Sequence, residues 1–432
     1  MDSESGTSGG PAGGRAPWPV RRLFPLLATV IMAAAGMAGT IWGPRLYGKT
    51  AWALPDDLWG TLIAAQRLAH LDLGGLYTLP TQLVSLPGAA IILVPAIAVI
   101  DLTGLPLTVP HAHGAYPSLW LFAGPYQVAI SAVALFATDA IAEHLGATRP
   151  KRFWLAAASA TALWSVTVRW GHPEDAVAIG LLLYAILALA ESKPARSAWL
   201  AGAAVAVQPL VLLAFPLLAA VIEPRRLPGY VARAAAPGAL LLAVAAAANW
   251  TATIHAVTSQ PNYPTIDHPT PWIYLAPRIA DGQVAAGPGR ILAIAAALGC
   301  ALVVARRWRT VRTAGRWGSQ ALTEFLWWTA VALAIRSAFE PVMVAYYLWP
   351  PLAVALAAAA KDWSRLLPVG CTAVGLTFFS QVSWHDPWSW WTPMIAGLAL
   401  ALFFARPTPR RPGPAPQVLP EPGEELAADG AP

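Results

Sequence analysis

The stretch Leu23–Trp42 reads LFPLLATVIMAAAGMAGTIW and contains no charged residue. A helix needs about 20 apolar residues to cross the hydrocarbon core of a bilayer. Residues 235–248 and 352–360 are also free of charge, and Arg, Lys, Pro or Trp residues flank many such blocks. Blocks of this kind indicate membrane helices and not a β-barrel. The sequence therefore predicts an all-α polytopic membrane protein with about ten to twelve membrane helices.

The composition agrees with a lipid-facing exterior. Hydrophobic residues make up 57% of the 432 residues and charged residues only 12%, whereas a soluble domain carries about 25% charged residues. Too few charges remain to solvate the outside of a large core in water. The basic residues fall in short runs between apolar blocks and form no continuous basic surface with interleaved aromatics. We therefore expect membrane lipids as partners and no nucleic acid.

The basic runs also predict the topology. Short runs of Arg and Lys mark cytoplasmic loops, which places the protein in the cell (plasma) membrane with both termini in the cytoplasm. Residues 1–19 are predicted to be a disordered leader, residues 20–406 one membrane domain, and residues 407–432 a disordered Pro-rich tail.

The first half fits this topology less well. A second helix at residues 83–100 is predicted to return the chain to the cytoplasm, which leaves an odd number of crossings around residues 119–145. Gln208 and Pro209 interrupt the block at residues 198–222. They are predicted to break that block into a re-entrant hairpin, which is tolerated where it faces protein or a cavity.

The segment after the first helix is predicted to be external and carries Asp56 and Asp57 before an amphipathic helix. Such a helix is suited to lie along the membrane surface. One reading makes the two aspartates caps of this helix. In the other, one carboxylate is a general base that deprotonates an acceptor hydroxyl.

A second candidate segment reads Trp170-Gly-His172-Pro-Glu174-Asp175 between two apolar blocks. His172, Glu174 and Asp175 suit recognition of a phosphate or a sugar, or binding of a divalent cation. Alternatively, the proline and the two acids begin a helix, because both residue types favour the first helical turn. That alternative does not account for His172.

A third candidate segment begins at Arg336 and Glu340, which stand one helical turn apart and suit an intrahelical ion pair. Alternatively, Arg336 binds a lipid-linked phosphate bidentately. Tyr346 and Tyr347 follow, and His268 lies in a further loop with aromatic residues. Aromatic and acidic groups together suit sugar recognition, although Trp and Tyr also belong to any interfacial belt.

These segments together resemble the C-type superfold of integral membrane glycosyltransferases. The resemblance lies in the acidic external loop, the helix ending in Gly74-x-x-Tyr77, the Gly-His-Pro-Glu-Asp-Ala motif and the helix with Ala-Gly-x-Ala-x-Ala-x-x-Pro209-Leu. The chain is most similar to the polyprenol-phosphate-mannose-dependent α-mannosyltransferases of actinobacteria. The shared motifs are short and scattered between about residues 23 and 351.

The resemblance implies an inverting transfer of a sugar, expected to be mannose, from a polyprenyl-phosphate donor to a lipid or glycan acceptor on the external face. It implies Asp56 or Asp57 as the general base, and no cofactor or metal. The His172, Glu174 and Asp175 loop would lie beside the donor or acceptor pocket.

One position departs from the family pattern. Members often have a Lys at the position of Gln208, and that Lys is expected to contact the donor phosphate. Without this Lys, Arg336, Arg278 or Arg67 would bind the donor phosphate. The absence also leaves open that the donor is altered or that the activity is lost.

Two other classes of function remain open. One is a transporter or flippase for a lipid or small solute, although no inverted internal repeat is visible and little charge lies near mid-membrane. The other is a noncatalytic membrane protein of an envelope-assembly complex. Substitution of the aspartate pair separates an enzyme from a scaffold, because a scaffold would still assemble.

Overall fold

The structure is a computed structural model that describes most of the predicted membrane domain. It describes residues 17–47, 56–78, 83, 85–107, 119–258, 262, 264–265, 267–279, 282–312, 317–382 and 386–408, with the backbone alone at 43–47, 56–57, 120 and 309–312. The predicted leader and tail therefore lie outside the described residues, except for residues 17–19 and 407–408. Whether they are disordered stays a prediction.

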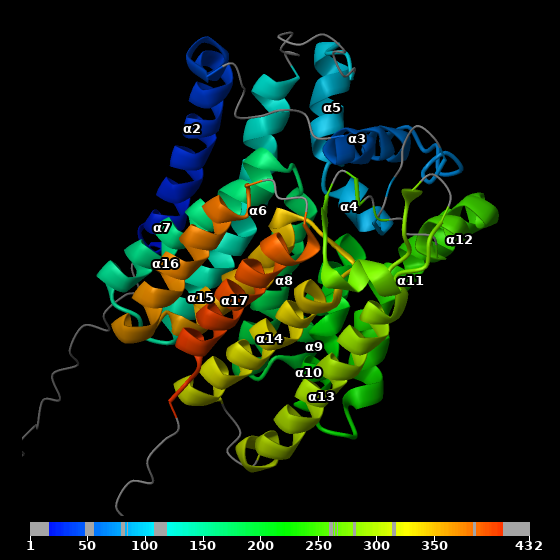
Figure 1. Cartoon of the computed structure of the whole chain (residues 1–432). Coiled ribbons are helices and arrows are strands. Elements are labelled where there is room, and N and C mark those ends of the chain that lie inside the picture. The colour runs from blue at the N-terminus through cyan, green and yellow to red at the C-terminus, as the bar shows by residue number, and fades with distance from the viewer. Residues whose placement is uncertain are drawn as a thin grey trace, which may run out of the picture.

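The described chain is almost entirely helical (Figure 1), which confirms the all-α prediction. The α-helices are α1 (Trp18–Arg21), α2 (Leu23–Tyr47), α3 (Asp56–Ala69), α4 (Pro87–Ile91), α5 (Val94–Thr103), α6 (Trp120–His144), α7 (Arg149–Trp164), α8 (Pro173–Ala190), α9 (Pro194–Val207), α10 (Phe215–Ala220), α11 (Leu227–Ala248), α12 (Trp250–Thr258), α13 (Gly287–Arg312), α14 (Ser319–Phe339), α15 (Trp349–Ala359), α16 (Trp363–Phe379) and α17 (Pro387–Ala405). Shorter elements are the π-helical η1 (Ser165–Arg169), the 3₁₀ turns η2 (Pro209–Leu213), η3 (Pro271–Leu275) and η5 (Ala345–Leu348), and the strands β1 (His268–Pro269) and β2 (Val342–Met343).

Six helices in the described chain are long and apolar enough to cross a membrane, namely α2, α6, α8, α11, α13 and α17. The protein is therefore a multi-pass membrane protein. Helix α8 is mostly buried at the centre of the bundle, whereas α2 and α11 are mostly exposed along their spans. An apolar helix that is exposed in the protein needs lipid around it, because water would not solvate it.

One end of the bundle collects the basic segments between helices. Lys151 Nζ donates to the Lys361 carbonyl at 2.6 Å and Lys361 Nζ donates to Ser319 Oγ at 3.0 Å, which brings together the starts of α7 and α14 and the end of α15. Arg365 donates to the Ala405 carbonyl at 3.4 Å, at the end of α17. We call this the basic end. The positive-inside rule predicts that it faces the cytoplasm.

The prediction that residues 83–100 return the chain across the membrane is wrong. This apolar run divides into α4 and α5, of 5 and 10 residues, which are too short to cross. Asp101 near the end of α5 contacts His70 just after α3 at 3.0 Å, so α5 stays at the end opposite the basic end. Helix α3 lies across that end next to α4 and α5 (Figure 1). Helix α6 makes the return instead, which removes the odd crossing.

The predicted break at Gln208 is also present. Helix α9 ends at Val207, and η2 and α10 turn the chain back toward Arg226 at the basic end. Counting η2 and α10 as one segment, the described residues contain twelve segments that alternate in direction: α2, α6, α7, α8, α9, η2–α10, α11, α13, α14, α15, α16 and α17. Both ends of the described chain consequently lie on the same side.

Close helix packing at the centre depends on one glycine. A Cβ atom built on Gly180 of α8 would lie 2.8 Å from the Ala134 amide nitrogen and from the Val133 carbonyl carbon of α6. The two helices run in the same direction, because His144 of α6 and Glu191 after α8 line one pocket at the basic end. Ala134 of α6 lies beside Gly180 of α8. Gln127 comes before Ala134 by the same number of residues as Pro173, the first residue of α8, comes before Gly180. Gln127 therefore lies beside the start of α8.

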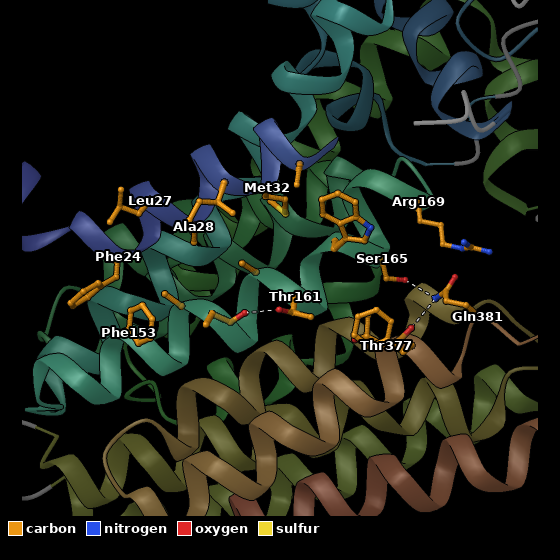
Figure 2. A pocket seen from close by; sticks show the side chains of 17 residues that line it. Phe24, Leu27, Ala28, Met32, Phe153, Thr161, Ser165, Arg169, Thr377 and Gln381 are labelled. Atoms are coloured by element: carbon orange, nitrogen blue, oxygen red, sulfur yellow. Dashed lines mark hydrogen bonds between the residues drawn. The ribbon is translucent and has the colours of Figure 1, made fainter. Parts of the chain in front are cut away.

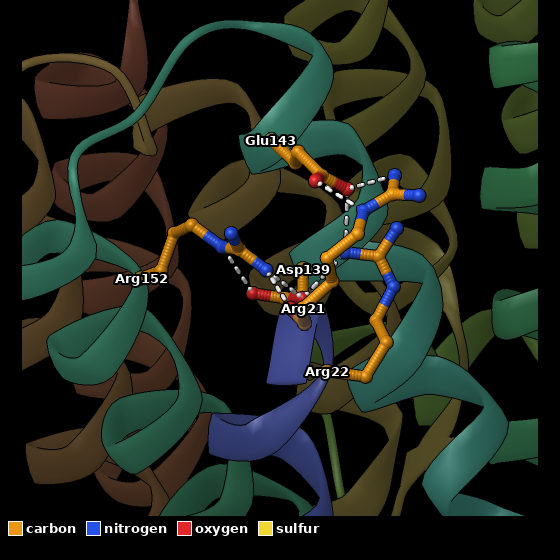
Figure 3. Close-up of polar contacts among 5 residues, drawn as sticks. All are labelled: Arg21, Arg22, Asp139, Glu143 and Arg152. Atoms are coloured by element: carbon orange, nitrogen blue, oxygen red, sulfur yellow. Dashed lines mark hydrogen bonds and ion pairs between the residues drawn. The ribbon is translucent and has the colours of Figure 1, made fainter. Parts of the chain in front are cut away.

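A buried ion cluster fixes the first helix to the rest of the bundle (Figure 3). Asp139 of α6 forms ion pairs with Arg22 at 2.8 Å and with Arg152 of α7 at 2.6 Å. Arg21 and Arg22 contact Glu143 at 2.9 Å and 2.7 Å. The Asp139 side chain is 3% exposed, so its charge depends on both arginines.

We predict that Asp139→Asn lowers the free energy of unfolding by about 3–5 kcal/mol, because it leaves a buried charge uncompensated. Chemical unfolding in detergent micelles measures the change. Glu223→Gln is the matched control. Its pair with Arg226 at 3.0 Å is exposed and contributes less than about 1 kcal/mol. Equal effects of the two substitutions would contradict the assigned role of Asp139.

Candidate functional site

The Trp170 to Asp175 segment forms a tight turn between α7 and the buried helix α8. Helix α7 passes into η1, Gly171 adopts a left-handed φ of 67°, and α8 begins at Pro173. The predicted helix start is therefore present. The acids are nevertheless buried, and His172 Nδ1 lies 2.7 Å from Glu174 Oε1. An exposed acid in the first turn is enough to begin a helix. The burial of Glu174 and its contact with His172 are not needed for that purpose.

Asp175 is held in place by Gln208. Gln208 Nε2 donates to Asp175 Oδ1 at 2.6 Å. Ser85 Oγ shares its proton between the Val207 carbonyl at 3.2 Å and Gln208 Oε1 at 3.4 Å, and Tyr77 Oη donates to the Ser85 carbonyl at 3.1 Å. Burial raises the pKa of the Tyr77 phenol, so it remains a donor at neutral pH. Three segments distant in sequence therefore meet in one hydrogen-bond chain.

A glycine makes this approach possible. A Cβ atom on Gly88 at the start of α4 would lie 2.2 Å from the Ala206 carbonyl oxygen at the end of α9. Any larger residue would push α4 away from α9, and with it Ser85 away from Gln208.

Glu340 lies between two arginines. Its carboxylate is 2% exposed, and Oε1 is 3.7 Å from Arg336 and 3.6 Å from Arg290. Among the described residues, Glu340 Oε1 has no hydrogen-bond partner. The expected intrahelical pair is thus present but long, and it is shared with an arginine from α13. Two guanidinium groups face the Glu340 carboxylate, and the Asp175 carboxylate also attracts Arg336.

Aromatic side chains connect the arginines to the buried acids. The Tyr346 ring stacks on the His172 ring with centroids 4.0 Å apart, and Trp170 lies 5.9 Å from Tyr346. Tyr347 packs edge-on against Tyr346 at 4.9 Å, and the Arg336 guanidinium lies 4.2 Å from the Tyr347 ring centroid. We call Trp170, Tyr346 and Tyr347 the aromatic row. Both tyrosines contact residues of the candidate site, and their part in sugar recognition stays a prediction.

The segment before α13 holds the Glu340 region in place. Strand β1 pairs antiparallel with β2, and Thr270 Oγ1 donates to the Glu340 carbonyl at 2.6 Å. Trp272 Nε1 donates to the Ala338 carbonyl at 2.7 Å. His268 stacks on Trp390 of α17 with ring centroids 4.1 Å apart. His268 thus helps to position the site, and its ring packs on α17.

We call the group that these contacts join the polar cluster. It consists of His172, Glu174, Asp175, Gln208, Arg290, Arg336 and Glu340. It lies at the end opposite the basic end, which the topology predicts to be external.

Two predicted residues are placed differently. The Arg278 side chain is exposed, and no contact among the described residues joins it to the polar cluster. Arg67 donates to the Gly75 carbonyl and, at 3.0 Å, to Thr78 Oγ1, so it stabilises the turn before α4. Of the three arginines considered for the donor phosphate, Arg336 alone is in the cluster.

The aspartate pair begins α3, as predicted, but the side chains of Asp56 and Asp57 lie outside the described residues. Their assignment as base or cap stays a prediction. Helix α3 packs on α4, and α4 packs on α9. The helix that starts with these aspartates is thus one element away from Gln208.

Sequence reasoning missed Arg290 and Gln127. Arg290 meets Glu340 only through packing of α13 on α14, which no local pattern reveals. Gln127 is 1% exposed, and neither polar atom of its amide has a hydrogen-bond partner among the described residues. A buried glutamine in a membrane helix was a visible signal, because such groups are expensive and commonly functional.

Neither the models of known protein families nor the curated proteins give a match to this chain. The resemblance to C-type glycosyltransferases therefore rests on the residues quoted above.

We predict that Gln208→Leu destabilises the protein by about 1–3 kcal/mol, because buried Asp175 loses its hydrogen-bond donor. The melting temperature of the detergent-solubilised protein reports the change. Gln320→Leu is the control, since Gln320 is exposed and bonds only the Thr408 carbonyl at 3.2 Å among the described residues. An unchanged melting temperature for Gln208→Leu would refute the proposed dependence of Asp175 on Gln208.

Proposed function

We propose that the protein is a membrane glycosyltransferase. It moves a sugar, mannose by the resemblance, from a polyprenyl-phosphate donor to a lipid or glycan acceptor on the predicted external face. The observation that carries the proposal is the position of Arg290 and Arg336 on either side of buried Glu340, next to the aromatic row and the His172 loop.

The charge of these groups suits the departing phosphate. A phosphodiester donor carries one negative charge, and the phosphate monoester that leaves carries about −1.5 to −2 at neutral pH. Donors that are fixed in a site of low dielectric stabilise such a developing charge strongly. The guanidinium groups of Arg290 and Arg336 lie 3.6 Å and 3.7 Å from Glu340 Oε1, which accepts no hydrogen bond among the described residues, so N–H donors remain for this purpose.

The reaction is a displacement at the anomeric carbon. The acceptor hydroxyl oxygen forms a bond to that carbon while the bond from carbon to the phosphate oxygen breaks, and polyprenyl phosphate leaves with the electron pair. The hydroxyl proton passes to the carboxylate of Asp56 or Asp57. Attack opposite the leaving group inverts the configuration. Aromatic faces and buried acids bind the apolar and hydroxylated sides of a sugar, and these groups lie together in the aromatic row and the His172 loop.

A transporter is the second candidate, and one observation favours it. Helix α9 is broken at Gln208, and η1 interrupts the path from α7 to α8. Discontinuous helices commonly build the binding sites of transporters. In the glycosyltransferase proposal the same breaks carry the residues of the polar cluster. Transfer of labelled sugar to an acceptor, as opposed to its movement across a vesicle membrane, separates the two functions.

We predict that Arg336→Gln and Arg290→Gln each lower the transfer rate by about 10²–10³-fold, the typical effect of removing one charge-stabilising donor. The assay follows labelled polyprenyl-phosphate mannose in lipid nanodiscs with a lipid extract as acceptor. Arg278→Gln is the control, as an exposed arginine outside the cluster. The double variant Arg336→Gln with Glu340→Gln keeps the local charge balanced, so it separates loss of folding from loss of catalysis. Full activity of either single variant would contradict the assigned phosphate site.

The aspartate pair has a separate test in the same assay. We predict that either Asp56→Asn or Asp57→Asn lowers transfer by about 10²–10⁴-fold, as expected when a general base is removed. The affinity for the donor should stay within about threefold, since a base contacts the acceptor hydroxyl. Normal transfer by both folded variants, and by the double variant, would rule out this pair as the base.

A further inference from the structure

An apolar groove of about 550 Å³ lies between α2, α7 and α16. Figure 2 shows its walls: Phe24 and Leu27 come from α2, Phe153 from α7, and Thr377 from α16. Alanines such as Ala160 and larger apolar side chains line the groove. The volume is in the range of ligand sites, about 300–1,000 Å³.

One end of the groove is polar. Ser165, Arg169 and Gln381 line it there, and Gln381 Nε2 donates to Ser165 Oγ at 3.0 Å (Figure 2). The Arg169 side chain is exposed, and among the described residues it forms no ion pair. The groove thus combines an apolar channel with a single cation at its end.

This polar end adjoins the polar cluster through the aromatic row. Trp170 follows Arg169 directly, and its Nε1 donates to Gln381 Oε1 at 3.2 Å. The other side of Trp170 faces Tyr346, which stacks on His172. A molecule with its head group at Arg169 would therefore lie on one side of the aromatic row, while Arg290 and Arg336 lie beyond it.

We propose that this groove binds one chain of an anionic phospholipid that carries a hydroxyl in its head group. The phosphate would pair with Arg169, since an exposed guanidinium beside an apolar channel complements a phosphate attached to an acyl chain. This assignment as the sugar acceptor rests on the function proposed above. There the donor phosphate occupies Arg290 and Arg336, so Arg169 is left for a second lipid. The apolar walls favour a lipid acceptor over a glycan.

The test uses phosphatidylglycerol with a photoreactive group in one acyl chain, because this lipid has both the phosphate and the hydroxyls. The full-length protein is placed in phosphatidylcholine nanodiscs with the probe and irradiated. Mass spectrometry then locates the labelled peptides. Labelling of α2, α7 and α16 is expected, with unlabelled phosphatidylglycerol competing and phosphatidylcholine not competing.

Two variants probe the groove. Arg169→Gln should lower labelling about tenfold or more, the effect of losing one charge-assisted hydrogen bond. Ala160→Phe should abolish labelling by filling the channel. Arg278→Gln is the control for the loss of an exposed arginine. Ala295→Phe is the control for an added ring, because Ala295 is exposed on α13, away from the groove. Both controls should label like the wild type.

Two outcomes would overturn the proposal. One is equal competition by phosphatidylcholine with unchanged labelling of Arg169→Gln, which would mean that bulk lipid fills the groove. The other is absence of label from α2, α7 and α16. Binding of polyprenyl-phosphate mannose, measured separately, should be unaffected by Arg169→Gln, while the KM for the lipid acceptor rises. Failure of the wild type to bind that donor would instead reject the proposed glycosyltransferase, and the labelling result would still decide what the groove binds.

Discussion

The requirement that every backbone polar group be satisfied inside a bilayer shapes this protein. It makes the chain helical, and it confines each break in a helix to places where protein covers the freed groups. The break at Gln208 illustrates this, because its side chain bonds Asp175 and is itself bonded by Ser85. The turn at Gly171 and the segment after α14 are two further interruptions. All three converge on the polar cluster, so the same constraint that builds the bundle also gathers its chemistry in one place.

The charges divide into two groups with different roles. At the basic end, Arg21, Arg22 and Arg152 form short ion pairs with Asp139 and Glu143, and this cluster joins α2 to the bundle. At the opposite end, Arg290 and Arg336 lie 3.6 Å and 3.7 Å from the Glu340 carboxylate. Arginines held in short ion pairs stabilise the fold and offer few donors to a ligand. Arginines that face a carboxylate without a short hydrogen bond keep N–H donors for an anion, which is the basis of the function proposed here.

Sequence reasoning succeeded where the signal was local. Charge-free blocks predicted the helices, and Asp56 and Pro173 marked helix starts that the structure confirms. It failed at residues 83–100, because hydropathy does not register that this run is divided into two short helices. Sequence reasoning could not predict the contact of Gln208 with Asp175 or that of Arg290 with Glu340. Both depend on which helices pack together, and no spacing in the sequence encodes that.

The central claim is that Arg290 and Arg336 bind the phosphate of a polyprenyl lipid. An experimental structure of the full-length protein in nanodiscs with bound polyprenyl phosphate tests it most directly. The account predicts the phosphate within hydrogen-bond distance of both guanidinium groups, beside Glu340 and Tyr347, with the polyprenyl chain leading into the membrane. A phosphate found instead at Arg278, Arg67 or Arg169, with Arg290 and Arg336 bearing no ligand, would contradict it.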